Sequence, residues 1–314
     1  MNNMEGLKKS IENIAIKNGA DIVGFASADR FEDPALKRIF PEVKTVIAVA
    51  FRVLRGSFRG VEEGTTFYQY STTGKETIEE TVMPGALLKI CNVIEDAGFL
   101  GIPQRKNQTL RKEKEVLNPE MLHTKWYEAG AKELQLDFTK AAEICGIGEI
   151  GFSGSLLTER FGPFQRIGLV LTDAVLPETE HKSLNLCDNC GECVKACPGN
   201  AVNKDGGIDK NRCAVYYRGA NMTKNPFMPK DAYANFEKRD EIINGTAELS
   251  FEECVEVMEN TGFYPPIKHG YVSSICGKAC DRACYVHLEE KGLLKSKFHT
   301  PFRRRPVWKL PILK

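Results

Sequence analysis

The sequence has no excess of charge of either sign, no long apolar run and no visible internal repeat. Its 43 Lys and Arg residues against 42 Asp and Glu residues leave a formal net charge of +1, so no overall field gathers nucleic acid or anionic lipid. The first 25 residues hold neither an uninterrupted apolar stretch nor a twin-arginine pair, and no later stretch has the apolar length to cross a bilayer. We therefore expect a cytoplasmic globular protein without a membrane partner.

Cysteine, by contrast, is plentiful, with 11 residues. In a chain without an export signal, the reducing compartment favours metal or cluster ligation over disulfides. The stretch CDNCGECVKACP places Cys187, Cys190, Cys193 and Cys197 at the C-x₂-C-x₂-C-x₃-C-P spacing of bacterial ferredoxins, which bind [4Fe–4S] clusters. A zinc knot or free thiols are the alternatives, but zinc needs only two such pairs and gains nothing from Cys-Pro.

A second cluster needs four more thiolates, because the fourth cysteine of this motif ligates the other cluster. Cys213 in NRCAVYY and three cysteines in CGKACDRAC supply that number. The crossover assigns Cys187, Cys190, Cys193 and Cys284 to one cluster, and Cys197, Cys213, Cys276 and Cys280 to the other. Cys254 is an alternative to Cys276, although its helical spacing favours a packed thiol, as we also expect for Cys91 and Cys145 on apolar helix faces.

Hydrophobic periodicity predicts an α/β layer that ends near Pro177. The expected elements are helices at Gly6–Lys17 and Ala86–Ala97, a strand at Ile22–Ala26, and strands in TVIAVAFRV and FQRIGLVLTDAVL. The polar residues 104–128 are expected to form a long excursion over the core, of the kind that can serve as a lid. The basic, proline-broken tail is expected to be a strap over the surface, with a polyanion-binding patch as the alternative. We expect domains at residues 1–180 and 181–314.

The stretch GIGEIG, residues 146–151, has the glycine spacing of a dinucleotide-binding fingerprint. That fingerprint requires a strand that runs into the glycines and a helix that leaves them. Here LDFTKAAEIC precedes the glycines and has helical periodicity. The order is therefore wrong for a nucleotide site, and the simplest alternative is a helix C-cap and turn without a ligand.

Read together, the glycine loop and the cysteines resemble the cobalamin-dependent family of epoxyqueuosine reductases and reductive dehalogenases. AAEICGIGEIGFSGSLLTERFGPFQRIGLVLTD is similar to the corrinoid-binding segment, and CDNCGECVKACPGNAV with NRCAVYY is similar to the cluster pattern. YQYSTTGKETIEE with VIEDAGFLGIPQ is similar to the family's tyrosine-bearing helix and following strand. The resemblance implies an α+β fold, in which a nitroreductase-like α/β core carries a C-terminal ferredoxin-like domain with two [4Fe–4S] clusters.

The resemblance further implies a base-off cobalamin without a protein histidine below the cobalt, and the chain has no Asp-x-His-x-x-Gly motif. Glycines let backbone press against the flat corrin ring, where side chains collide. The corrinoid-binding residues would be Gly146, Gly148, Gly151, Ser153, Gly154, Leu156, Leu157 and Thr172. A nearby acid would supply a proton, and the candidates are Tyr68, Tyr70, Tyr127 and Asp137.

The expected function is reductive cleavage of a small-molecule substrate, either dehalogenase-like or the reduction of an epoxide or alcohol, with electrons passing from the clusters to cobalt. A donor such as ferredoxin or flavodoxin would supply the electrons. One alternative is an electron donor or reductive activator for a corrinoid protein. Another is epoxyqueuosine reduction on tRNA. Two departures from the tRNA-modifying branch weaken this alternative: Phe152 occupies a position where a basic residue is usual, and we expect no HEAT-like extension after Cys284.

Overall fold

The computed structural model describes residues 4–105, 136–263 and 272–312. These residues form two compact units, each built from separate stretches of chain. Unit 1 comprises Met1–Arg52, Glu79–Gly148 and Arg166–Ser183, and unit 2 comprises Val53–Ile78, Glu149–Gln165 and Leu184–Lys314. The last change of unit, after Ser183, lies close to the expected domain boundary at residue 180, whereas residues 53–78 and 149–165 join the cysteine-rich unit.

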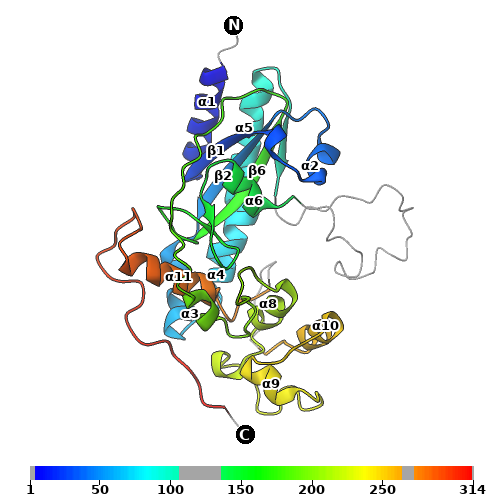
Figure 1. The fold of residues 1–314 in the computed structure, drawn as a ribbon, viewed down its shortest axis with the longest axis vertical. Coiled ribbons are helices and arrows are strands. Elements are labelled where there is room, and N and C mark those ends of the chain that lie inside the picture. The colour runs from blue at the N-terminus through cyan, green and yellow to red at the C-terminus, as the bar shows by residue number, and fades with distance from the viewer. Residues whose placement is uncertain (1–3, 106–135, 264–271, 313–314) are drawn as a thin grey trace, which may run out of the picture. The chain divides into compact units, whose positions relative to one another are not determined.

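Unit 1 is built on a four-stranded sheet with the order β1-β2-β6-β3 (Figure 1). Its strands are β1 (Ile22–Ser27), β2 (Thr45–Arg52), β3 (Gly101–Gln104) and β6 (Gln165–Thr172). β1 pairs antiparallel with β2, and β3 pairs antiparallel with β6. Seven of the eight β2 residues are buried, because a central strand that is covered on both faces needs a continuous apolar run. The expected strands are thus confirmed.

The helices of unit 1 are α1 (Met4–Lys17), η1 (Ala28–Arg30), α2 (Pro34–Ile39), α5 (Met83–Asp96) and α6 (Phe138–Ile144). α1 packs against α5, and the inner face of α5 buries Leu87, Ile90 and Ile94 completely. α5 begins three residues before the expected start because Pro84 is suited to a first helical turn. It ends just before Gly98, whose φ of 86° lies in the left-handed region that glycine favours.

Unit 2 is mainly helical, with short elements between irregular stretches. Its elements are η2 (Arg55–Phe58), α3 (Arg59–Glu63), α4 (Gln69–Ser71), η3 (Thr72–Glu76), β4 (Glu149–Ile150), β5 (Leu156–Leu157), α7 (Glu192–Ala196), α8 (Lys210–Tyr217), η7 (Met222–Lys224), α9 (Arg239–Asn244), α10 (Phe251–Glu259) and α11 (Ala279–Glu290); η4 (Ile78–Val82) links it to unit 1. β4 and β5 form an antiparallel hairpin, and α11 packs against α7.

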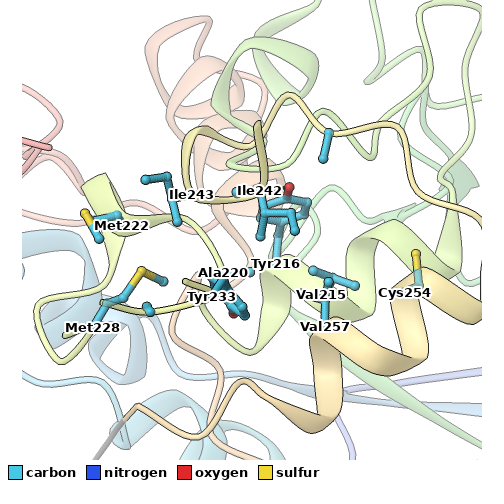
Figure 2. Packing of buried hydrophobic residues seen from close by; sticks show 12 residues of the cluster. Val215, Tyr216, Ala220, Met222, Met228, Tyr233, Ile242, Ile243, Cys254 and Val257 are labelled. Atoms are coloured by element: carbon cyan, nitrogen blue, oxygen red, sulfur yellow. Dashed lines mark hydrogen bonds between the residues drawn. The ribbon is translucent and has the colours of Figure 1, made fainter. Parts of the chain in front are cut away.

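A separate apolar cluster holds α8, α9 and α10 together (Figure 2). Tyr216 lies at its centre, 2% exposed, and its hydroxyl donates a hydrogen bond to the Ile242 carbonyl at 3.2 Å. Cys254 is 1% exposed in the same cluster, beside Val215 and Val257. The expectation that Cys254 is a packed thiol is therefore confirmed.

The C-terminal tail is a strap on unit 2, as expected. Phe302 is 1% exposed, the Trp308 indole N–H donates to the Val61 carbonyl at 2.9 Å, and the Leu310 N–H donates to the Thr223 carbonyl at 2.9 Å. Among the described residues, no helix has the length and apolar character needed to cross a membrane. Most of the excursion expected at residues 104–128, and with it Tyr127, lies outside the described residues.

Candidate functional site

Four cysteines of unit 2 come together from the ferredoxin-like loop and α11. Cys187, Cys190 and Cys193 lie on the loop that turns at Asn189 and Gly191, both with positive φ, and enters α7. The Cys284 thiol on α11 interacts electrostatically with all three of these thiols. The packing of α7 against α11 thus joins residues nearly a hundred positions apart.

A second group of four forms next to the first. Cys197 caps the end of α7, Cys213 lies in α8, and Cys280 lies in the first turn of α11. The Cys213 thiol interacts electrostatically with Cys276 and Cys197, and the Cys280 thiol with Cys276 and Cys213. Each thiol's cysteine neighbours among these interactions belong to its own group, which agrees with the crossover assignment. Which cluster each thiol binds stays a prediction.

Backbone N–H groups point at sulfur in both groups. The Phe152 N–H donates to Cys187 Sγ at 3.2 Å, and the Ala201 N–H donates to Cys197 Sγ at 3.2 Å. Such hydrogen bonds stabilise negative charge on sulfur and help to set a cluster's potential. Phe152 directly follows the glycine loop, so the loop places a hydrogen-bond donor next to Cys187 of the first thiol group.

Glu149, inside the glycine motif, organises the chain that leads into Cys187. Its carboxylate accepts hydrogen bonds from the N–H groups of Leu184 at 3.1 Å, Asn185 at 2.9 Å and Cys187 at 3.2 Å, and from that of Leu186. Sequence reasoning missed this residue, because its partners are more than thirty positions away. The sequence feature that could have pointed to Glu149 is its position as an acidic residue between the glycines of GIGEIG.

Burial governs the acidity of the thiols. Burial raises the pKa of Cys213 to about 12, and it also raises the pKa of Cys276, Cys280 and Cys284. These four free thiols are therefore protonated near neutral pH, and ligation must replace each of their protons with a metal ion. Two sets of four thiolates satisfy the ligand requirement of two [4Fe–4S] clusters, so these residues fit the expected metal groups.

The remaining cysteines, Cys91, Cys145 and Cys254, are buried. Burial raises the pKa of both Cys91 and Cys145 to about 12. Cys254 has Asp209, Arg212 and Glu253 as electrostatic neighbours. The exchange of Cys254 for Cys276 thus has no support in the geometry, and Cys91 and Cys145 are core residues as expected.

The glycine loop follows a helix, as the periodicity predicts. Gly146, with a φ of 76°, ends α6, and its N–H donates to the Glu143 carbonyl at 2.9 Å. The turn between β4 and β5 is closed by the Gly151 N–H on the Ser155 carbonyl at 2.9 Å and the Gly154 N–H on the Gly151 carbonyl at 2.8 Å. These contacts are those of a helix C-cap and a hairpin turn.

The other residues of the expected corrinoid set are also engaged by the chain. Leu156, Leu157 and Ser153 are buried, and a Cβ on Gly151 would lie 2.8 Å from Leu157 Cδ1. Thr172 is fully buried, and its hydroxyl accepts from the Ala174 N–H at 3.1 Å. Gly146, Gly148 and Thr172 belong to unit 1, and the other five residues to unit 2. Neither described cavity is lined by any of the eight residues, and their role in binding a corrinoid stays a prediction.

The candidate proton donors also divide between the units. Asp137 in unit 1 is the N-cap of α6, where Oδ1 accepts from the N–H groups of Thr139 and Lys140 at 3.0 Å each, and it lines a cavity of about 380 Å³. In unit 2, Tyr70 is 4% exposed, stacks on Phe58 with ring centroids 4.8 Å apart, and interacts electrostatically with Lys278. Tyr68 is half-buried beside it in sequence.

Unit 2 also has an arginine-lined cavity of about 580 Å³ that sequence reasoning did not predict. The tail strap contributes Arg304 and Arg305, and α3 contributes Arg59 and Glu63. Glu63 pairs with Arg59 and, at 3.6 Å, with Arg305. Three guanidinium groups against one carboxylate give this cavity a local positive charge that the net charge of the chain conceals.

Comparison with known proteins relates the chain to iron–sulfur reductases. A family model described as a 4Fe-4S binding domain matches residues 181–203. An epoxyqueuosine reductase from Synechococcus sp. (strain RCC307) is 32% identical over 88 residues, which are 28% of this chain and 27% of the relative. A tetrachloroethene reductive dehalogenase from Dehalobacter restrictus is 31% identical over 88 residues, which are 27% of this chain and 15% of the relative.

The matched stretch thus spans about a quarter of the length of the curated epoxyqueuosine reductase. Among solved structures, an epoxyqueuosine reductase from Streptococcus thermophilus is similar with a TM-score of 0.48 and 18% identity. That similarity covers 85% of this chain and 69% of the other chain.

Proposed function

We propose that this chain, a member of the superfamily of epoxyqueuosine reductases and reductive dehalogenases, is a reductase that uses two [4Fe–4S] clusters. The observation that carries the proposal is the convergence of eight thiols into two groups of four within unit 2. Bound clusters would supply electrons one at a time. The sequence relatives, which are reductases by name, support the same reaction class.

The chain's own residues would hold and tune the clusters. The N–H groups of Phe152 and Ala201 stabilise charge on the sulfurs of Cys187 and Cys197. Glu149 fixes the backbone that enters the first ligand. Tyr70 is the proton donor that we favour, because Lys278 supplies a basic neighbour in the same unit.

Anaerobic reconstitution of the full chain with iron and sulfide tests the proposal. We expect about eight iron atoms per chain and two paramagnetic signals after reduction, one for each cluster. Cys193→Ser and Cys213→Ser should each erase one signal and spare the other, whereas the control Cys254→Ser should spare both. Loss of neither signal, or zinc in place of iron, would overturn the assignment.

The resemblance extends the proposal to a cobalamin as the electron acceptor and to a nitroreductase-like topology for the α/β part. Among the residues that the structure describes, no contact within either unit supports the cobalamin. Reconstitution in the presence of cobalamin tests this extension through the absorbance of a base-off corrinoid. A chain that binds two clusters but retains no corrinoid would instead fit an electron donor or reductive activator for a corrinoid protein.

A second candidate is epoxyqueuosine reduction on tRNA, which the arginine-lined cavity favours. Arg59, Arg304 and Arg305 offer guanidinium groups, which suit phosphate oxygens. We expect tRNA binding that weakens steeply with salt, and a smaller salt slope for Arg304→Ala combined with Arg305→Ala. Binding that is independent of salt, or unchanged in this variant, would remove the candidate.

A further inference from the structure

A charged pair lies at the start of α11, between ligands of the two proposed clusters. Lys278 Nζ is 3.2 Å from Asp281 Oδ2, and the Asp281 side chain is 8% exposed. The Ser155 hydroxyl donates to Asp281 Oδ1 at 2.7 Å and the Cys280 thiol donates to the same oxygen at 3.7 Å, so both carboxylate oxygens are engaged. The position of the Asp281 carboxylate is thus fixed from two sides, by Lys278 in its own segment and by Ser155 in the turn between β4 and β5.

The two charges do not face the two thiol groups equally. Asp281 interacts electrostatically with Cys213 and Cys280 of the second group and with Cys284 of the first. Lys278 interacts with Cys213 and Cys280, both of the second group. Lys278 lies two residues from Cys276 and two from Cys280, so its ammonium is next to ligands of the second group, whereas the carboxylate also faces Cys284 of the first group.

Helix stability does not account for a lysine at this position. Lys278 is the N-cap of α11 and has a φ of 54° and a ψ of 55°. A cation at a helix N-terminus opposes the helix dipole, and the left-handed conformation costs a non-glycine residue roughly 1 kcal/mol or more. Gly or Asn would suit this backbone better, so the side chain needs another explanation.

We propose that Lys278, oriented by Asp281, makes the cluster held by Cys197, Cys213, Cys276 and Cys280 the more easily reduced of the two. Reduction adds one negative charge to a cluster, and a nearby cation stabilises that charge. Electrons that enter the pair of clusters then collect on the second cluster. Lys278 thus acts through the reduction potential of the second cluster and does not itself take part in the chemistry. The inference rests on the proposed function, since it requires both clusters.

Redox titration of the reconstituted full chain, followed by electron paramagnetic resonance, tests the inference. The signals are assigned with Cys193→Ser and Cys213→Ser. In the unmodified chain we expect the second cluster to be reduced at the higher potential. Lys278→Gly removes the charge and suits the backbone, so it should fold and lower the potential of the second cluster alone. Lys278→Arg keeps the charge and should keep the order of reduction.

Two controls separate this effect from others. Lys195 lies near Cys190 of the first group but is 69% exposed, so solvent should screen its charge and Lys195→Met should leave both potentials unchanged. Tyr70→Phe should also leave both potentials unchanged, which separates electron positioning from proton donation. An unshifted second potential in Lys278→Gly, or equal shifts of both, would overturn the inference while two clusters remain. A chain without two clusters would overturn the proposed function itself.

Discussion

Glu62→Gln removes a buried carboxylate from between two guanidinium groups of unit 2. The Glu62 side chain is 4% exposed, and its two oxygens pair with Arg282, 9% exposed, and with Arg303 of the tail strap, 24% exposed. Breaking a buried pair costs about 3 to 5 kcal/mol, because it leaves a charge without its partner. Gln retains one hydrogen-bonding oxygen, so we expect a loss of about 3 kcal/mol in the free energy of unfolding.

The Glu62→Gln substitution should also weaken cluster binding by the second thiol group. Arg282 also donates from Nε to the Gly277 carbonyl and from a terminal nitrogen to the Cys276 carbonyl, both at 2.9 Å. These bonds fix the loop that presents Cys276. Without Glu62 the guanidinium loses the group that orients it, so the variant should also release iron from the second cluster faster than from the first.

The pH dependence follows from the same contacts. Burial raises the pKa of Glu62, but the charges of Arg282 and Arg303 outweigh burial and hold the pKa below its ordinary value of 4.5. The carboxylate therefore contributes its full stability above about pH 4.5 and loses it as the pH falls through the lowered pKa. The deficit of Glu62→Gln relative to the unmodified chain should narrow over that range.

Urea unfolding of the cluster-loaded chain under anaerobic conditions measures the deficit. With a slope of about 3 kcal/mol/M, a loss of about 3 kcal/mol moves the midpoint by about 1 M. Arg303→Met is the matched control and should cost only about 1 kcal/mol, because that partner is more exposed. A deficit for Glu62→Gln no larger than that of Arg303→Met, or one that does not change with pH, would refute the reasoning.

Three further predictions concern single contacts of unit 2. Glu149→Gln should weaken the charge-assisted hydrogen bonds that order the entry to Cys187 by about 2 kcal/mol in total, seen as faster transfer of iron to a chelator; an unchanged rate would contradict this. Ser250→Ala removes the capping box of α10 and should lower stability by about 1 kcal/mol in thermal unfolding, with no change in the cluster signals. Gly245→Ala places a Cβ 1.9 Å from the Pro198 carbonyl oxygen at a φ of 78° and should cost more than about 2 kcal/mol, against about 1 kcal/mol for Gly292→Ala, where nothing lies within 4 Å; equal costs would show that the clash is relieved.

Local patterns carry much of the fold in the sequence. The buried run of β2, the amphipathic face of α5 and the helix before Gly146 were all predicted from periodicity, because each depends on residues close together in the chain. The spacing from Cys187 to Cys197 likewise encodes a cluster-binding loop by itself, and the matched family model covers it. The strap character of the tail followed from its prolines and basic residues.

Contacts between distant residues were decided by the tertiary structure alone. Glu149 orders residues 184–187 across more than thirty positions. Lys278 and Asp281 pair within the first turn of α11, but Ser155 and Cys213, which they face, come from distant stretches of chain. Hydrophobic periodicity predicts which face of a helix or strand is buried, but it does not predict which residues pack against that face. The sequence by itself predicted the candidate ligands and determined most of the elements. Folding decided which groups surround these cysteines, because many of those groups come from stretches that only three-dimensional packing brings together.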